Sequence, residues 1–168
     1  AGSAATRQEL LHCAALRQLS CSIMLMLGML RELRFIPTGD LEFTPLATRF
    51  SQRFAVFGSL IQPAPLPYER YLDMCVTKLC ELPIEHLLAA TSNSLKSAKV
   101  AVDKAMQGAD SPPTALQKAE LLSLAKVAVA NRAVLAAQLE PLPEPESMRA
   151  AFDFSTHKCF PTLVLTKR

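Results

Sequence analysis

The placement of proline restricts where helices can form in this chain. Five prolines lie at positions 37, 45, 63, 65 and 67, and three more lie at 141, 143 and 145. Because proline lacks a backbone N–H and clashes with the preceding helical turn, neither stretch fits inside an α-helix. The sequence therefore predicts helical segments that are separated by a Pro/Phe-rich connector (37–67) and followed by a Pro-rich linker and docking arm (141–168).

The first helix is predicted from a capping signal and a long apolar pattern. Thr6 and Glu9 have the spacing of a capping box, so we expect the helix to begin there and interpret residues 1–5 as an expression remnant or a disordered end. Apolar residues keep helical spacing over residues 10–33, and the later half is apolar on both sides, which predicts burial all round. The uninterrupted apolar run 23–30 is shorter than the ~20 residues of a membrane span, so no membrane contact is expected.

Two further helices are predicted to form an antiparallel hairpin. Pro83 begins one helix, which ends at Gln107 with Gly108 as a left-handed cap, and Ser111-Pro112 begins another that continues to Glu140. Abundant alanine in both would let their axes approach closely. The pair resembles a tetratricopeptide-like unit, but the chain shows no self-similarity at ~34 residues, so a repeat array is not predicted.

Aromatic residues along the connector indicate that it packs on an apolar surface. Phe50, Phe54 and Phe57 have i, i+4, i+7 spacing and would lie on one face of a short helix. The prolines at 63, 65 and 67 favour a polyproline II strap, pinned by Tyr68 and Tyr71 at the start of a helical pattern that runs to residue 82. Such straps also bind SH3 or WW domains, and we prefer the structural interpretation.

The last seventeen residues carry large apolar side chains without a helical repeat. A free apolar arm would form an exposed patch of a kind that soluble proteins usually avoid, so we expect the arm to be docked. Its expected packing or partner-contact residues include Phe152, Phe154, Phe160 and Pro161.

Polar residues within the arm have two interpretations each. If both flanking phenylalanines are buried, Asp153 points to the other side and could cap a helix or pair with arginine; otherwise it is solvated. His157 and Cys159 would share one face of an extended strand, as a nucleophile and its base would. We prefer a His157 that donates one hydrogen bond and locks the docked arm, because a terminal arm rarely gives a catalytic site rigid support.

Three segments together resemble a known family. They are Arg49-Phe-Ser-Gln-Arg-Phe-Ala-Val-Phe-Gly-Ser-Leu, Pro63-Ala-Pro-Leu-Pro-Tyr-Glu-Arg-Tyr and the closing Phe152-Asp-Phe-Ser-Thr-His-Lys-Cys-Phe-Pro. In order and spacing they resemble the C-terminal region of the large auxiliary subunit of NatC, an amino-terminal acetyltransferase complex. The closing segment follows the family pattern closely, although Cys159 stands where an aromatic is expected, and Ala55-Val56 replaces a proline of the first segment.

This resemblance implies a non-catalytic scaffold in the cytoplasm. The expected partners are the rest of the auxiliary subunit, the NatC catalytic subunit and a small Sm-like subunit, with the ribosome as a further candidate. The complex would acetylate nascent chains that begin with methionine and a hydrophobic residue. The chain itself, residues 1–168, would be a single all-α domain of a longer protein: a long N-terminal helix, an extended connector, a helical hairpin and an extended C-terminal arm.

Composition gives no positive sign of chemistry. A net charge of +3 without a dense basic patch does not predict nucleic-acid binding. The five scattered cysteines indicate reduced thiols; a metal site at Cys75, Cys80 and His86 is less favoured than ordinary buried thiols. The five glycines form no phosphate-binding loop, so we predict no acetyl-CoA site, no other cofactor or small-molecule substrate, and no catalytic or metal-binding residue.

Two rival functions remain at this stage. The chain could be an independent peptide-binding adaptor in which the helical hairpin forms a groove and the C-terminal arm fills it until displaced. An enzyme of unknown type is a weaker third hypothesis, and acetylation of a test peptide would support it.

Overall fold

Within the residues that it describes, the computed structural model of the protein has three helices and one small sheet. In chain order these are α1 (Gly2–Glu32), α4 (Ile84–Gln107), α5 (Ala115–Gln138), β1 (Met148–Asp153) and β2 (Thr162–Lys167). The structure describes residues 2–37, 82–108 and 112–168, with positions 48, 50, 51, 67 and 69 between them. The predicted connector and the helix expected up to residue 82 therefore lie almost entirely outside the described residues.

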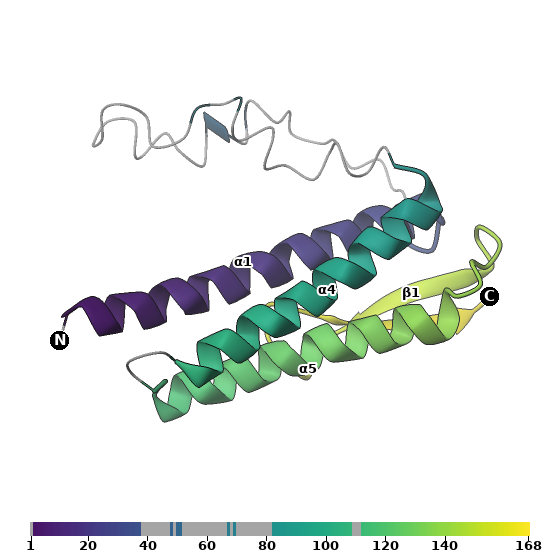
Figure 1. The fold of residues 1–168 in the computed structure, drawn as a ribbon. Coiled ribbons are helices and arrows are strands. Elements are labelled where there is room, and N and C mark those ends of the chain that lie inside the picture. The colour runs from purple at the N-terminus through teal and green to yellow at the C-terminus, as the bar shows by residue number, and fades with distance from the viewer. Residues whose placement is uncertain are drawn as a thin grey trace.

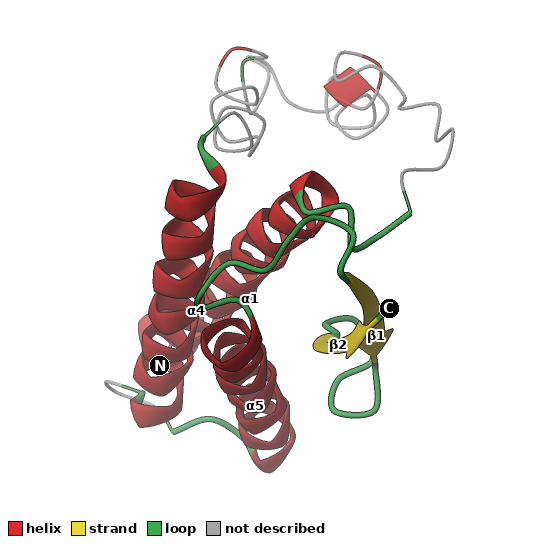
Figure 2. Ribbon diagram, turned by 90° about the vertical axis from the view of Figure 1, so that its right-hand side faces the viewer, coloured by secondary structure: helices red, strands yellow, loops and turns green. Residues whose placement is uncertain are grey.

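The three helices lie side by side, and each runs antiparallel to the next (Figure 1). α4 packs against both α1 and α5. The expectation of an all-α fold is wrong at the C-terminus, where the arm folds back on itself as an antiparallel pair of strands. The protein is therefore mostly helical, with a two-stranded sheet at one side (Figure 2).

α1 begins and ends earlier than its sequence signals indicate. It begins at Gly2, so Thr6 lies inside the helix and does not cap it; the intervening alanines are the strongest helix formers. It ends at Glu32, before Pro37, because two backbone bonds close the last turn. Phe35 N–H donates to Leu30 O at 2.9 Å and Arg34 N–H donates to Arg31 O at 2.9 Å, which is a Schellman motif.

One face of α1 forms much of the core. Leu19, Met26 and Leu30 are fully buried among the apolar faces of α4 and α5. The expected burial of the later half on all sides is wrong, since Met24 is 49% and Leu27 is 36% exposed. Among the described elements, α4 and α5 cover one side of α1, and these two side chains lie on the other side.

By length and composition alone, residues 7–32 of α1 would be sufficient to cross a membrane. This differs from the expectation drawn from the short uninterrupted apolar run. A core helix passes the same test, and 44% of the apolar window of α1 is buried inside the protein.

Local caps fix the ends of the helical hairpin. Pro83 is the N-cap of α4, and Gly108 closes that helix with a φ of 45°. α5 begins after Thr114, whose hydroxyl accepts Gln117 N–H at 3.3 Å while Gln117 Oε1 accepts Thr114 N–H at 3.0 Å. This capping box places the N-cap of α5 at Thr114, three residues beyond the expected Ser111, because it satisfies two backbone donors at the start of the helix.

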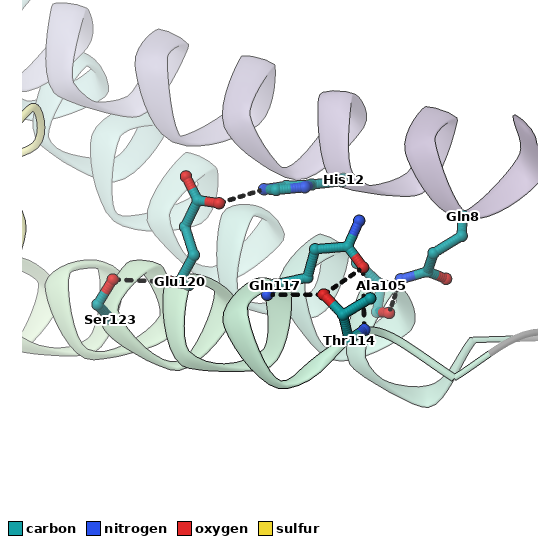
Figure 3. Close-up of polar contacts among 7 residues, drawn as sticks. All are labelled: Gln8, His12, Ala105, Thr114, Gln117, Glu120 and Ser123. Carbon is teal, nitrogen blue, oxygen red and sulfur yellow. Dashed lines mark hydrogen bonds and ion pairs between the residues drawn. The ribbon is translucent and has the colours of Figure 1, made fainter. Parts of the chain in front are cut away.

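Polar contacts fix how α1 lies against the other two helices. Figure 3 shows Gln8 and His12 of α1 pointing toward the helical hairpin of α4 and α5. Gln8 Nε2 donates to Ala105 O of α4 at 2.7 Å, and His12 Nε2 lies 3.4 Å from Glu120 Oε2 of α5. The second contact is within ion-pair distance but lacks hydrogen-bond geometry. Because buried polar groups need specific partners, these contacts oppose a sliding of α1 along α4.

Candidate protein-interaction surface

The C-terminal hairpin is the described segment that carries the closing sequence motif. β1 and β2 pair in the register Met148↔Lys167 to Asp153↔Thr162, and residues 154–161 form the loop between them. An isolated two-stranded sheet is only marginally stable in water. Alternate residues therefore pack inward, with Ala150, Leu163 and Leu165 buried and Val164 43% exposed.

Backbone hydrogen bonds attach the hairpin to the end of α1. Ala150 N–H donates to Phe35 O at 2.9 Å, and Glu146 N–H donates to Leu33 O at 2.9 Å. Phe35 itself is fully buried. The Schellman turn that ends α1 thus leaves two carbonyl groups that receive the incoming strand.

A buried asparagine attaches the other strand to α5. Asn131 Nδ2 donates to Pro161 O at 2.9 Å, and its Oδ1 accepts Leu163 N–H at 2.6 Å. The Asn131 side chain is fully buried. Sequence analysis did not single it out, although an asparagine between Val127 and Leu135 at four-residue spacing interrupts an apolar stripe and was the available signal.

Asp153 organises the start of the hairpin loop. Its carboxylate accepts Ser155 N–H at 2.8 Å and the Ser155 hydroxyl at 2.7 Å. These hydrogen bonds hold the pKa of Asp153 below its ordinary value. Asp153 is exposed, which was one of its two interpretations. The described contacts of its carboxylate are within the hairpin, not with a helix N-terminus or an arginine, because β1 ends at Asp153 and the next residues turn back within reach.

His157 closes the same loop, by a route that differs from the prediction. Its Nδ1 accepts Cys159 N–H at 3.1 Å and Phe160 N–H at 3.2 Å, and its ring lies 5.1 Å from the ring of Phe160, centroid to centroid. His157 was expected to donate a hydrogen bond. That expectation is wrong for Nδ1, which accepts two backbone hydrogen bonds instead. Nor do His157 and Cys159 share one face of a strand, because both lie in the loop.

The aromatic residues of the arm divide into anchors and one exposed ring. Phe152 and Phe160 are half-buried and Pro161 is buried, whereas Phe154 is 51% exposed. Phe154 lies beyond the strand because β1 ends at Asp153, and the loop presents its ring to solvent. A packing or partner-contact role for Phe154 stays a prediction.

Other residues predicted for the site are only partly described. Phe50 is half-buried, and Phe54, Phe57, Tyr68 and Tyr71 lie outside the described residues. So do Cys75 and Cys80 of the less favoured metal site, whereas His86 is exposed. Within residues 2–37, 82–108 and 112–168, no three His, Cys, Asp or Glu side chains come together in a way that could hold a metal.

The described residues thus form a layer of helices and a β-hairpin whose loop exposes Phe154. A family model described as "NAA35-like, TPR repeats" matches residues 2–163, and the chain belongs to that family. Its members are auxiliary subunits of amino-terminal acetyltransferase complexes, which work with a separate catalytic subunit. A comparison with curated proteins found no match.

The family's description names repeats that the sequence analysis did not predict. The helical hairpin formed by α4 and α5 explains why the period of these repeats is hard to detect in the sequence. α4 begins at Ile84 and α5 ends at Gln138, so one pair of helices takes well over the ~34 residues of an ordinary tetratricopeptide unit. Self-similarity at that period is not expected from helices of this length.

Proposed function

We propose that this chain is a non-catalytic scaffold segment of the large auxiliary subunit of the NatC complex. In that role it helps to assemble the catalytic subunit and a small Sm-like subunit in the cytoplasm, close to the ribosome. The assembled complex acetylates nascent chains that begin with methionine and a hydrophobic residue. Membership of the auxiliary-subunit family over residues 2–163 carries the proposal.

The hairpin loop supports an assembly role for the closing motif. Exposed aromatic rings are frequent anchors of protein interfaces, and Phe154 is such a ring at 51% exposure. The loop is held by Asp153 at one end and His157 at the other, while Asn131 fixes the strand beyond it. A loop held in this way loses little conformational entropy when a partner binds.

The adaptor hypothesis requires the arm to fill a groove of the helical hairpin. In the described structure, β2 packs on α5, and Ala150 within β1 donates a backbone hydrogen bond to Phe35 in the turn after α1. Deletion of residues 150–168 separates the two hypotheses. The scaffold hypothesis expects a large loss of stability, since burial of each large apolar side chain contributes ~1.5–3 kcal/mol. The adaptor hypothesis expects a folded chain that gains peptide binding.

The direct test is assembly with the other NatC subunits. The chain is mixed with the catalytic subunit, the small subunit and the rest of the auxiliary chain, and complex formation is measured by size exclusion with light scattering. We expect co-elution that is lost on Phe154→Ala and kept on Val164→Ala, a comparably exposed side chain on β2. A well-folded chain that joins none of these partners would contradict the proposal.

A further inference from the structure

A groove runs between α1 and α4, separate from the β1–β2 hairpin. Its volume is about 650 Å³. Leu11 and Ala14 line it from α1, and Val100 and Ala101 line it from α4, so its floor is apolar. The remaining lining residues are polar or basic and all belong to α4: Asn93, Lys96, Ser97 and Lys104.

A regular row of α4 side chains gives this groove its chemical character. Lys96, Val100 and Lys104 follow one another at four-residue spacing, so they lie along one side of the helix. Val100 is 45% exposed, and both lysines are exposed. The groove lining includes no carboxylate.

The acids of α4 nearest to this row do not neutralise it. Asp103 pairs with Lys99 at 2.6 Å. These two residues line the neighbouring groove between α4 and α5, which Lys96 and Val100 also border from their other side. The lining of the α1–α4 groove therefore combines an apolar floor with two lysines and no carboxylate.

We propose that the α1–α4 groove binds an acidic amphipathic helix of a partner protein. The argument is charge complementarity joined to shape: an apolar stripe would cover Val100 and Leu11, while flanking carboxylates would meet Lys96 and Lys104. From Asn93 to Lys104 the groove follows α4 for about 16 Å at 1.5 Å per residue, which is about three helical turns. Small side chains at Ala14, Ser97 and Ala101 let a second helix approach closely.

This partner site is independent of the assembly role proposed for the hairpin. Val100 and the two lysines lie on α4, whereas Phe154 lies in the loop beyond β1. Each surface can therefore be altered without changing the other, and either proposal can fail alone.

The probe is a designed peptide of about 18 residues, long enough for about five turns of helix. It has a leucine stripe on an alanine background with glutamates on both flanks, and a control peptide carries lysine in place of each glutamate. Binding of the labelled peptides to the full chain is followed by fluorescence anisotropy at low and high salt. We expect the acidic peptide to bind, the basic peptide to bind roughly tenfold or more weakly, and salt to weaken the acidic complex.

Matched variants locate the site. Lys96→Glu/Lys104→Glu should weaken binding of the acidic peptide roughly tenfold or more. Lys118→Glu/Lys126→Glu changes the net charge equally at two exposed positions of α5 with the same eight-residue spacing, outside the groove, and should not weaken it. Circular dichroism of each variant checks that the fold is retained. Val100→Ala, which removes only apolar contact, should weaken binding while leaving the salt dependence unchanged.

Several outcomes would overturn the proposal. Equal binding of both peptides, no binding of the acidic one, or equal effects of the two double variants would exclude an acid-selective groove. Two other occupants are tested alongside. Binding to phosphatidylserine vesicles that Lys96→Glu/Lys104→Glu abolishes, with no peptide binding, would indicate a lipid surface. A dimer by light scattering that the same variant dissociates would indicate a second copy of the chain.

Discussion

Arg34 and Glu146 lie 112 residues apart and join at 2.9 Å, Nη1 to Oε1. Both adopt a positive φ, 56° at Arg34 and 64° at Glu146, a region of backbone space that favours glycine. Arg34 turns the chain out of α1, and Glu146 turns it toward β1. The hydrogen bond from Arg34 lowers the pKa of Glu146, so the pair joins two strained turns where the hairpin meets the first helix.

Glycine at position 34 should be better tolerated than alanine. Both Arg34→Gly and Arg34→Ala remove the ion pair, whose side chains are largely exposed at 69% and 53% and which is therefore weak. The variants differ in the Cβ atom at a φ of 56°, which costs roughly 1–2 kcal/mol in a left-handed residue. We expect urea denaturation to give the glycine variant a free energy of unfolding about 1 kcal/mol higher than that of the alanine variant. The reverse order would show that this turn is not strained.

Asn131→Ala should destabilise the protein through the hairpin. The change leaves Leu163 N–H and Pro161 O without their partner in a buried site, and each unsatisfied group costs about 1–3 kcal/mol. We expect urea denaturation to show a loss of about 2–4 kcal/mol. Asn131→Asp keeps the acceptor for Leu163 N–H but places a carboxylate against Pro161 O, so it should also destabilise. Asn93→Ala, at an exposed asparagine of α4, is the control and should change little.

The helices were predictable because their signals are local. Apolar spacing and proline placement identify the helical stretches, and Gly108 was correctly expected to end α4. Helix ends were harder to predict, since competing local bonds decide them. The Thr114–Gln117 box starts α5 beyond Ser111, and a Schellman turn centred on an arginine ends α1 ahead of Pro37.

The candidate site was only partly predictable because its geometry depends on distant residues. An apolar arm could be inferred from its phenylalanines, but its folding into a hairpin depends on Phe35 and Asn131, which lie far away in sequence. The end of β1 at Asp153 exposes Phe154, and composition does not reveal where a strand stops. The kind of complex was predictable from the resemblance of three short segments, and the family model confirms its broader part, an auxiliary subunit of an amino-terminal acetyltransferase complex.

Alanine substitutions of two leucines of α1 should differ in their cost to stability, because only one side of this helix is buried. Leu19 is fully buried and Leu27 is 36% exposed. Leu19→Ala should lower the free energy of unfolding by about 2–5 kcal/mol, because it leaves a cavity beneath α4 and α5. Leu27→Ala should cost less than about 1 kcal/mol, since it opens no cavity. Similar losses at both positions by urea denaturation would contradict the one-sided burial of α1.

The order of the hairpin loop should depend on pH through Asp153. Hydrogen bonds from Ser155 lower the pKa of Asp153 in the folded chain. A carboxyl with a lowered folded pKa contributes stability that is present above its unfolded pKa and lost as the pH falls through the folded value. We therefore expect the Ser155 amide resonance to stay constant at neutral pH and to shift only in acid, below the ordinary aspartate range. Asp153→Asn should abolish this acid transition, whereas Glu144→Gln, at an exposed carboxylate before β1, should leave it unchanged.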